Sequence, residues 1–183
     1  MKKVYIFLAD GFEEIEGLTV VDIARRAGID AVMVSITGKK MVEGAHGIGV
    51  SADILFDEHE FLDADMLVLP GGMPGTNALM EHEALRNLLI EFDNKKKNIA
   101  AICAAPSIFG MNGLLKGKNA ACYPGFENKL IKANVCYDNV VEDGHIITSR
   151  GMGTAIEFSL AIVTKLIGKE AADNLAKAIV YRA

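Results

Sequence analysis

The chain is poor in several residue types, and each shortage excludes a class of protein. Its 183 residues include no tryptophan, four prolines and only three cysteines. The cysteines, Cys103, Cys122 and Cys136, are odd in number and form neither a CxxC pair nor a zinc-ligand pattern. Neither a disulfide-stapled secreted domain nor a zinc-binding module is therefore expected. Reduced thiols in a cytoplasmic protein are the simplest interpretation.

Positive charge and long apolar runs are also scarce. The 19 lysines and arginines are outnumbered by 24 acidic residues, which gives a net charge of −5. A nucleic-acid partner is not expected, because phosphate backbones require a basic face. Runs such as Val4–Ala9 and Met66–Leu69 are far shorter than the roughly 20 residues that span a bilayer, so no membrane partner is expected either. Met1-Lys2-Lys3 leads directly into a strand-like run, which does not resemble a signal peptide.

Short β-rich runs alternate with helical stretches throughout. This order predicts a doubly wound α/β fold, with a mostly parallel sheet covered by helices on both faces, in a single domain over residues 1–183. The Gly-rich stretch Met41–Asp53 predicts a hairpin or meander. Strands are expected at Val4–Ala9, Ala31–Ile36, Met66–Leu69 and Asn98–Ile102, with two short ones in Val140–Thr148. Helices are expected at Glu14–Ala27, Glu83–Asn94, Ala105–Asn112, Glu127–Ala133, Thr154–Ile167 and Glu170–Ile179.

In such a sheet, ligands bind beyond the carboxyl ends of the strands. Four loops are expected to meet there: Asp10–Glu16, Pro70–Thr76, Ile102–Pro106 and Ser149–Thr154. None carries a Walker loop or a complete GxGxxG, and the acidic first loop would repel a pyrophosphate. Nucleotide binding is therefore not expected.

Cys103 stands where an apolar strand turns into a helix between small residues. This pattern is typical of a nucleophile elbow, and a helix N-terminus is expected to lower the pKa of a thiol. A buried structural cysteine fits the local pattern about as well. The backbone N–H groups of Gly72 and Ala104 could form an oxyanion hole, although Pro70–Thr76 also fits an ordinary Gly/Pro turn. Glu16 follows Ile15 and is expected to point inward, with a raised pKa and a hydrogen bond to the thiolate.

The four histidines give weaker signals. His59 and His82 lie in charged stretches and are expected to be solvated, while His145 is expected to start a strand. His46 lies in a Gly-rich segment that could overhang a pocket. None is next to Cys103 in sequence, so no Cys–His pair is predicted.

Together these segments resemble the ThiJ/PfpI superfamily, in particular the branch of the Parkinson-associated protein deglycase. The matching pieces occur in family order over nearly the whole chain. They include Gly11-Phe12-Glu13-Glu14-Ile15-Glu16, Val68-Leu69-Pro70-Gly71-Gly72, Ala100-Ala101-Ile102-Cys103-Ala104-Ala105-Pro106 and Thr148-Ser149-Arg150-Gly151-Met152-Gly153-Thr154.

The resemblance implies a flavodoxin-like fold, a homodimer and a nucleophilic Cys103. Glu16 matches the protonated glutamate that hydrogen-bonds the family's cysteine, and Gly72 and Ala104 match its oxyanion-hole positions. His46 falls where some relatives carry an arginine near the pocket. Ala104 replaces the histidine of the protease-like branch, which makes a peptidase less favoured. Tyr123 replaces a histidine of the human-type branch.

Two functions are compatible with these residues. The first is a glyoxalase or deglycase that acts on 2-oxoaldehydes or glycated proteins, with no metal or organic cofactor. The second is a redox-sensing or chaperone-like stress protein that uses an oxidisable Cys103. Both require the same residues, so the sequence does not separate them.

Overall fold

A computed structural model describes residues 1–181 of the chain. At its centre lies a seven-stranded sheet in the order β10-β11-β7-β6-β1-β2-β5. Its strands pair in parallel, except that β10 runs antiparallel to β11. In chain order they are β1 (Lys3–Leu8), β2 (Asp30–Ser35), β5 (Ile54–Leu55), β6 (Met66–Leu69), β7 (Asn98–Ile102), β10 (Val140–Asp143) and β11 (Ile146–Ser149).

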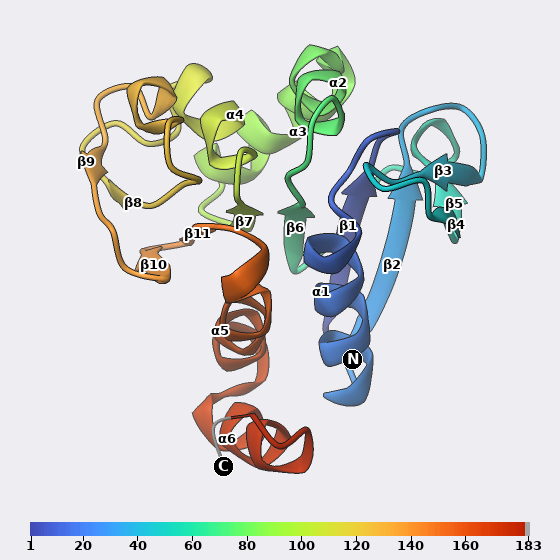
Figure 1. The fold of residues 1–183 in the computed structure, drawn as a ribbon, viewed down its shortest axis with the longest axis vertical. Helices are drawn as coiled ribbons and strands as arrows, with labels where there is room; N and C mark the ends of the chain where they lie inside the picture. The colour runs from blue at the N-terminus through green and yellow to red at the C-terminus, as the bar shows by residue number, and fades with distance from the viewer. Residues whose placement is uncertain (182–183) are drawn as a thin grey trace.

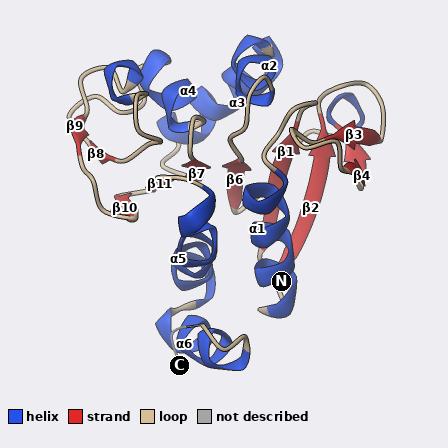
Figure 2. Ribbon diagram, viewed as in Figure 1, coloured by secondary structure: helices blue, strands red, loops and turns tan. Residues whose placement is uncertain are grey.

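Helices cover both faces of the sheet (Figures 1 and 2). One face packs against α1 (Glu14–Arg26) and α5 (Ala155–Ile167), and α6 (Lys169–Ala178) packs against α5. The other face packs against α2 (Gly75–Glu81), α3 (Glu83–Asn94) and α4 (Pro106–Met111). Single 3₁₀ turns lie at Phe56–Glu58, Glu127–Lys129 and Met152–Thr154. The predicted doubly wound α/β architecture is confirmed.

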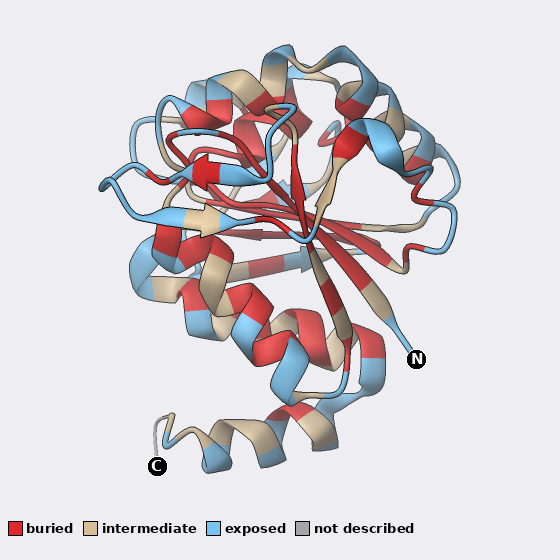
Figure 3. Cartoon of the chain, turned by 90° about the vertical axis from the view of Figure 1, so that its right-hand side faces the viewer, coloured by how far each residue is buried: buried red, intermediate tan, exposed pale blue. Residues whose placement is uncertain are grey.

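The alternation of side chains along β1 shows how the two layers share the sheet. Val4, Ile6 and Leu8 enter the core beneath α1 and α5. Tyr5 and Phe7 enter the core beneath the helices of the opposite face. Successive side chains of a strand point to opposite faces, so a strand that is apolar throughout requires cover on both sides. Figure 3 shows the resulting buried central layer.

Two small additional sheets lie outside the central one. β3 (Met41–Glu43) and β4 (Gly49–Ser51) form an antiparallel pair, which confirms the hairpin predicted in this stretch. The end of β3 is held to the first loop, because the Gly11 N–H donates to the carbonyl of Glu43 at 2.7 Å. The second small sheet pairs β8 (Asn119–Ala120) with β9 (Asn134–Val135) in parallel.

Most predicted elements have the expected position, with two differences. The helix predicted over residues 127–133 is only the 3₁₀ turn Glu127–Lys129, and the chain turns at Lys132, whose φ is 61°. Conversely, α2 begins at Gly75 directly after Pro74, where the sequence suggested only a loop. A proline next to a glycine favours a turn, but proline also suits the start of a helix.

The topology identifies the position at which a ligand site is expected. β1 lies between β2 and β6, and the chain builds the sheet outward in opposite directions on the two sides of β1. Such a switch point leaves a crevice at the carboxyl ends of the strands. Over residues 1–181, every helix is too short or too polar to cross a membrane.

Candidate functional site

The four predicted loops do meet, at the carboxyl ends of β1, β6, β7 and β11. They enclose a cavity of about 350 Å³ together with the hairpin turn and the segment after β8. Its lining comprises Glu13, Glu16, His46, Gly72, Met73, Cys103, Ala104, Tyr123, Phe126 and Met152. All five residues singled out from the sequence, Cys103, Glu16, Gly72, Ala104 and His46, therefore border one space.

Cys103 occupies a tight turn between β7 and α4. Its φ of 65° lies in the left-handed region, which an L-residue with a side chain enters only at an energetic cost. Backbone hydrogen bonds hold it there. The Cys103 N–H donates to Ser149 O at 3.0 Å, and its carbonyl accepts the N–H of Tyr123 at 2.7 Å. This is the strand–turn–helix elbow expected from the sequence.

Glu16 lies in the first turn of α1 and points inward, as predicted. Only 1% of its surface is exposed, and its Oε2 atom accepts the Gly71 N–H at 2.9 Å. The carboxyl group also forms a hydrogen bond with the Cys103 thiol. Burial raises the pKa of Glu16 to about 7, although the bonds from Cys103 and Gly71 act in the opposite direction. A carboxyl group that titrates near neutral pH is suited to proton transfer.

The expectation that the pKa of Cys103 is lowered is wrong. Burial, followed by the charge of Glu16 and the hydrogen bond to it, raises the pKa of the thiol to about 12. Backbone N–H groups of Gly72 and Ala104 favour the thiolate but do not overcome these effects. α4 begins only at Pro106 and has six residues, so its dipole at Cys103 is weaker than the effects of burial and a nearby carboxylate.

Two adjacent glycines allow β6 to approach the elbow closely. A Cβ on Gly71 would lie 2.6 Å from the Cβ of Cys103 and 2.8 Å from Glu16 Oε2, so no side chain fits there. Gly72 has a φ of 89°, which favours glycine, and its N–H is directed at the sulfur. Gly72 and Ala104 therefore place two backbone N–H donors beside one sulfur atom, where they favour the thiolate.

His46 lies at the rim of the cavity and is held by Glu14. Its Nδ1 is 2.8 Å from Glu14 Oε2, and its backbone N–H donates to Oε1 at 2.7 Å. Burial alone would raise the pKa of Glu14, but the bonds from His46 lower it to about 2, and Glu14 in turn raises the pKa of His46. Glu13, Glu14 and His46 bring three metal-type donor atoms within 4.8 Å, although two of them already bond each other.

Sequence reasoning missed the apolar wall of the cavity. Four apolar side chains line it: Tyr123, Phe126, Met73 and Met152. The sequence singles out only Tyr123, as a position where relatives carry a histidine. Two glycines are the sequence features that could have indicated this wall. Gly125 lies between the two aromatic residues, and the Tyr123 ring approaches Gly151. The two rings lie 6.5 Å apart in an edge-to-face arrangement.

The other histidines lie outside this cavity. His59 is exposed, as predicted. His82 is not simply solvated, because its Nδ1 accepts the Leu85 N–H at 3.1 Å and caps α3. His145 immediately precedes β11 and is buried 2.6 Å from Asp93 Oδ1.

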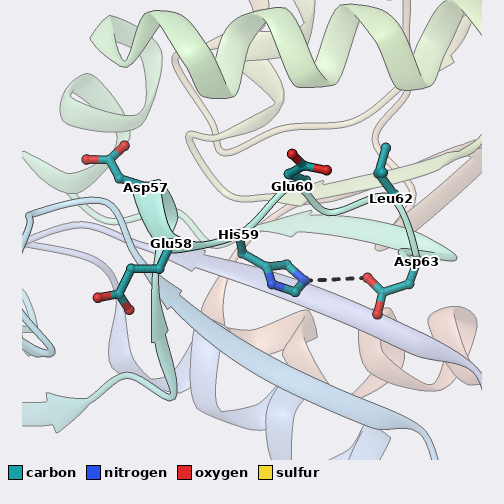
Figure 4. A pocket seen from close by; sticks show the side chains of 6 residues that line it. All are labelled: Asp57, Glu58, His59, Glu60, Leu62 and Asp63. Atoms are coloured by element: carbon teal, nitrogen blue, oxygen red, sulfur yellow. Dashed lines mark ion pairs between the residues drawn. The ribbon is translucent and has the colours of Figure 1, made fainter.

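A second hollow, on the segment before β6, lacks the features of a reactive site. Its side chains are Asp57, Glu58, His59, Glu60, Leu62 and Asp63. Figure 4 shows His59 facing Asp63, with the other acidic groups directed elsewhere, and the His59–Asp63 distance is 3.6 Å. Asp63 also pairs with Lys3 at the amino end of β1, so this hollow lies away from Cys103.

Comparisons with known proteins agree with this geometry. A model of the DJ-1/PfpI family matches residues 2–165. The "Protein DJ-1 homolog B" of Arabidopsis thaliana is 40% identical over 183 residues, and the match covers 99% of this chain but 42% of that protein. This chain thus spans less than half the length of that relative. The "Glutathione-independent glyoxalase DJR-1.2" of Caenorhabditis elegans is 32% identical over 90% of this chain and 88% of its own.

The solved structure of oxidized DJ-1 from Toxoplasma gondii is similar throughout. It superposes with a TM-score of 0.96 at 34% identity and covers 100% of both chains. The structural neighbours share the flavodoxin-like arrangement, which confirms the fold expected from the resemblance. On the family match and this full-length similarity, the chain belongs to the DJ-1/PfpI family.

Proposed function

We propose that this protein is a cysteine-dependent enzyme that acts on 2-oxoaldehydes or their protein adducts, as a glyoxalase or deglycase. The observation that carries the proposal is the buried Glu16 carboxyl group hydrogen-bonded to Cys103, beside the N–H groups of Gly72 and Ala104. The C. elegans relative, named as a glutathione-independent glyoxalase, supports the same chemistry.

The two pKa values indicate where the proton lies during the reaction. Between pH values of about 7 and about 12, the pair formed by Glu16 and Cys103 holds one proton. As sulfur attacks the aldehyde carbon, a C–S bond forms and the C=O π pair moves onto oxygen. The thiol proton passes to Glu16, which can return it to the new alkoxide to give a hemithioacetal.

An internal redox step would complete the reaction without an added oxidant. Glu16 removes the proton from the former aldehyde carbon, and a proton is delivered to the neighbouring carbon. The first carbon becomes a thioester and the second an alcohol, so one is oxidised while the other is reduced. Water then releases a 2-hydroxy acid and restores the thiol. The N–H groups of Gly72 and Ala104 would stabilise the oxyanions.

Steady-state turnover of methylglyoxal tests the proposal. The expected result is formation of lactate without glutathione, lost in Cys103→Ser and retained in Cys136→Ser, whose cysteine lies outside the cavity. Full activity in Cys103→Ser would refute it.

A redox-sensing or chaperone-like role is the second candidate. Cys103 faces an open cavity whereas Cys122 is buried, and the T. gondii relative was solved in an oxidized form. The raised pKa of Cys103 weighs against it, because peroxide reacts with the thiolate. Mass spectrometry after mild peroxide would support this role if Cys103 is oxidised selectively, and equal oxidation of all three thiols would refute it.

We also propose a homodimer that forms through the face of α1. Ile15 and Ile48 are about half exposed, Ile156 is more than one-third exposed, and with Leu18 they border a single hollow. Exposed isoleucines that gather in one place favour a contact surface over solvent. Three free cysteines fit a reducing, cytoplasmic compartment.

A further inference from the structure

We propose that the cavity selects 2-oxoaldehydes whose substituent is uncharged and apolar, such as an aryl or branched alkyl group, over methylglyoxal and over anionic carbonyl compounds. This inference rests on the proposed function, because it specifies the substrate class of the same thiol. Three features carry it: the size of the cavity, the chemistry of its lining and the contacts that hold its aromatic side chains.

The cavity is larger than a three-carbon substrate requires. Its volume of about 350 Å³ falls in the range of sites that enclose drug-sized molecules. Methylglyoxal would contact the reacting groups and leave much of the remaining space to water. A larger substituent would replace that water and bury apolar surface, which favours binding.

The lining is divided by chemistry. Glu13, Glu16 and His46 are ionisable, whereas Met73, Tyr123, Phe126 and Met152 supply two thioethers and two aromatic rings. Aromatic side chains bind aryl groups through stacked or edge-to-face contacts, and the methionine thioether makes favourable contacts with aromatic rings. Among the described residues that line the cavity, no lysine or arginine is available for a carboxylate or phosphate. The carboxylates of Glu13 and Glu16 would repel such a group, and the imidazole of His46 is already paired with Glu14.

The aromatic part of the wall is fixed relative to the reactive sulfur. The Tyr123 N–H donates to the Cys103 carbonyl at 2.7 Å, so the two residues are joined directly. Its ring lies 3.2 Å from the position that a Cβ on Gly151 would take. Phe126 meets the Tyr123 ring edge to face and has the Lys129 ammonium 4.8 Å from its centroid. A wall held in this way is preorganised for a planar substituent, which reduces the cost of binding.

The test measures kcat/KM for phenylglyoxal, 4-carboxyphenylglyoxal and methylglyoxal. In the wild type we expect kcat/KM for phenylglyoxal to be at least about tenfold higher than kcat/KM for either of the other two compounds. Tyr123→Ala and Phe126→Ala should lower the ratio of the phenylglyoxal value to the methylglyoxal value about tenfold. Tyr123→Phe keeps the ring and should keep the preference.

Glu13→Gln removes one carboxylate from the lining. It should therefore reduce the difference in kcat/KM between phenylglyoxal and 4-carboxyphenylglyoxal. Met111→Ala, which removes an exposed thioether of α4 outside the cavity, should leave the ratios unchanged.

A second measurement does not depend on turnover. Alkylation of Cys103 by phenacyl bromide and by bromoacetone is followed by intact mass in a Cys136→Ser background, with both rates normalised to free cysteine. The expected result is faster phenacyl labelling that Tyr123→Ala and Phe126→Ala reduce. Turnover of methylglyoxal with no aryl preference, or a preference that both alanine variants retain, would overturn this inference and leave the proposed function intact. No turnover of any aldehyde, with aryl-selective alkylation, would refute the proposed function instead.

Discussion

Glu16 and Cys103 stand 87 positions apart in the chain and share a hydrogen bond inside the cavity. Each shifts the other's proton equilibrium. The charge of Glu16 raises the pKa of the thiol, and the thiol donates to the carboxylate and so opposes the effect of burial on Glu16. The reactivity of the sulfur therefore depends on burial and also on a carboxyl group of α1, far away in the sequence.

Glu16→Gln removes that charge while keeping an oxygen for the Gly71 N–H. We expect the pKa of Cys103 to fall from about 12, yet to stay above that of an exposed thiol, because burial remains. The pH dependence of iodoacetamide labelling at Cys103, followed by mass spectrometry, measures this change. Turnover should fall by about 10²–10⁴-fold because the proton acceptor is lost. An unchanged labelling profile would contradict the coupling.

The same substitution should alter the pH dependence of stability. The pKa of Glu16 is about 7 in the fold and 4.5 as the ordinary value, so folding favours its protonated form. This contribution is complete below pH 4.5 and is lost as the pH rises through about 7. At pH 8, Glu16→Gln should exceed the wild type in unfolding free energy by about 3 kcal/mol, and at pH 4 the difference should vanish.

Chemical denaturation at several pH values measures this difference. Glu81→Gln changes an exposed carboxylate of α2 and serves as the matched control, with no expected trend. A constant difference between wild type and Glu16→Gln across pH 4–8 would show that the buried carboxyl group does not titrate as described.

Gly71→Ala should inactivate the site without changing any reacting group. The added Cβ would overlap Cys103 and Glu16, so one of them must move. We expect kcat/KM to fall at least about 100-fold. The overlap should also reduce the unfolding free energy by about 1–3 kcal/mol. Gly153→Ala, whose Cβ meets open space, should change neither value. Full activity in Gly71→Ala would show that β6 and the elbow are less tightly packed than this.

Ile48→Glu should prevent dimer formation if the proposed surface is correct. It places a charge among the exposed isoleucines that border the hollow on α1 and the hairpin, where burial of an unpaired carboxylate is costly. Sedimentation velocity should show a monomer for this variant and a dimer for the wild type. Leu62→Glu, an equally drastic change on an exposed loop, should remain dimeric. A dimeric Ile48→Glu variant would place the interface elsewhere.

The sequence predicted the fold well because local patterns determine most of it. Met66–Leu69, Glu83–Asn94 and Asn98–Ile102 have their expected bounds, since a continuous apolar run or a clear helical period marks each. β8 and β9 contain two residues each and are too short for any period. α2 was missed because Pro74 and Gly75 suggest a turn when read without their neighbours.

The site was predictable in its parts and in half of its energetics, because the raised pKa of Glu16 was expected and that of Cys103 was not. Cys103 and Glu16 were found from a turn pattern and a family resemblance. The pKa of Cys103 was predicted wrongly, because segments distant in sequence bury the thiol and bring a carboxylate to it. Their effects on the pKa are larger than the effect of the local helix dipole. Tyr123 lines the cavity although 49% of its surface is exposed, and no local pattern around residue 123 reveals the contact of its ring with Gly151.

The four loops of the cavity come from separate crossovers of the sheet, and this has a consequence for the newly made chain. As the protein leaves the ribosome, Cys103 emerges long after Glu16 but well before Tyr123, Phe126 and Met152. Until β11 has joined the sheet beside β7, the backbone N–H of Cys103 lacks the Ser149 carbonyl that helps hold the elbow. The nascent chain therefore carries an ordinary cysteine, and the unusual thiol belongs only to the finished fold.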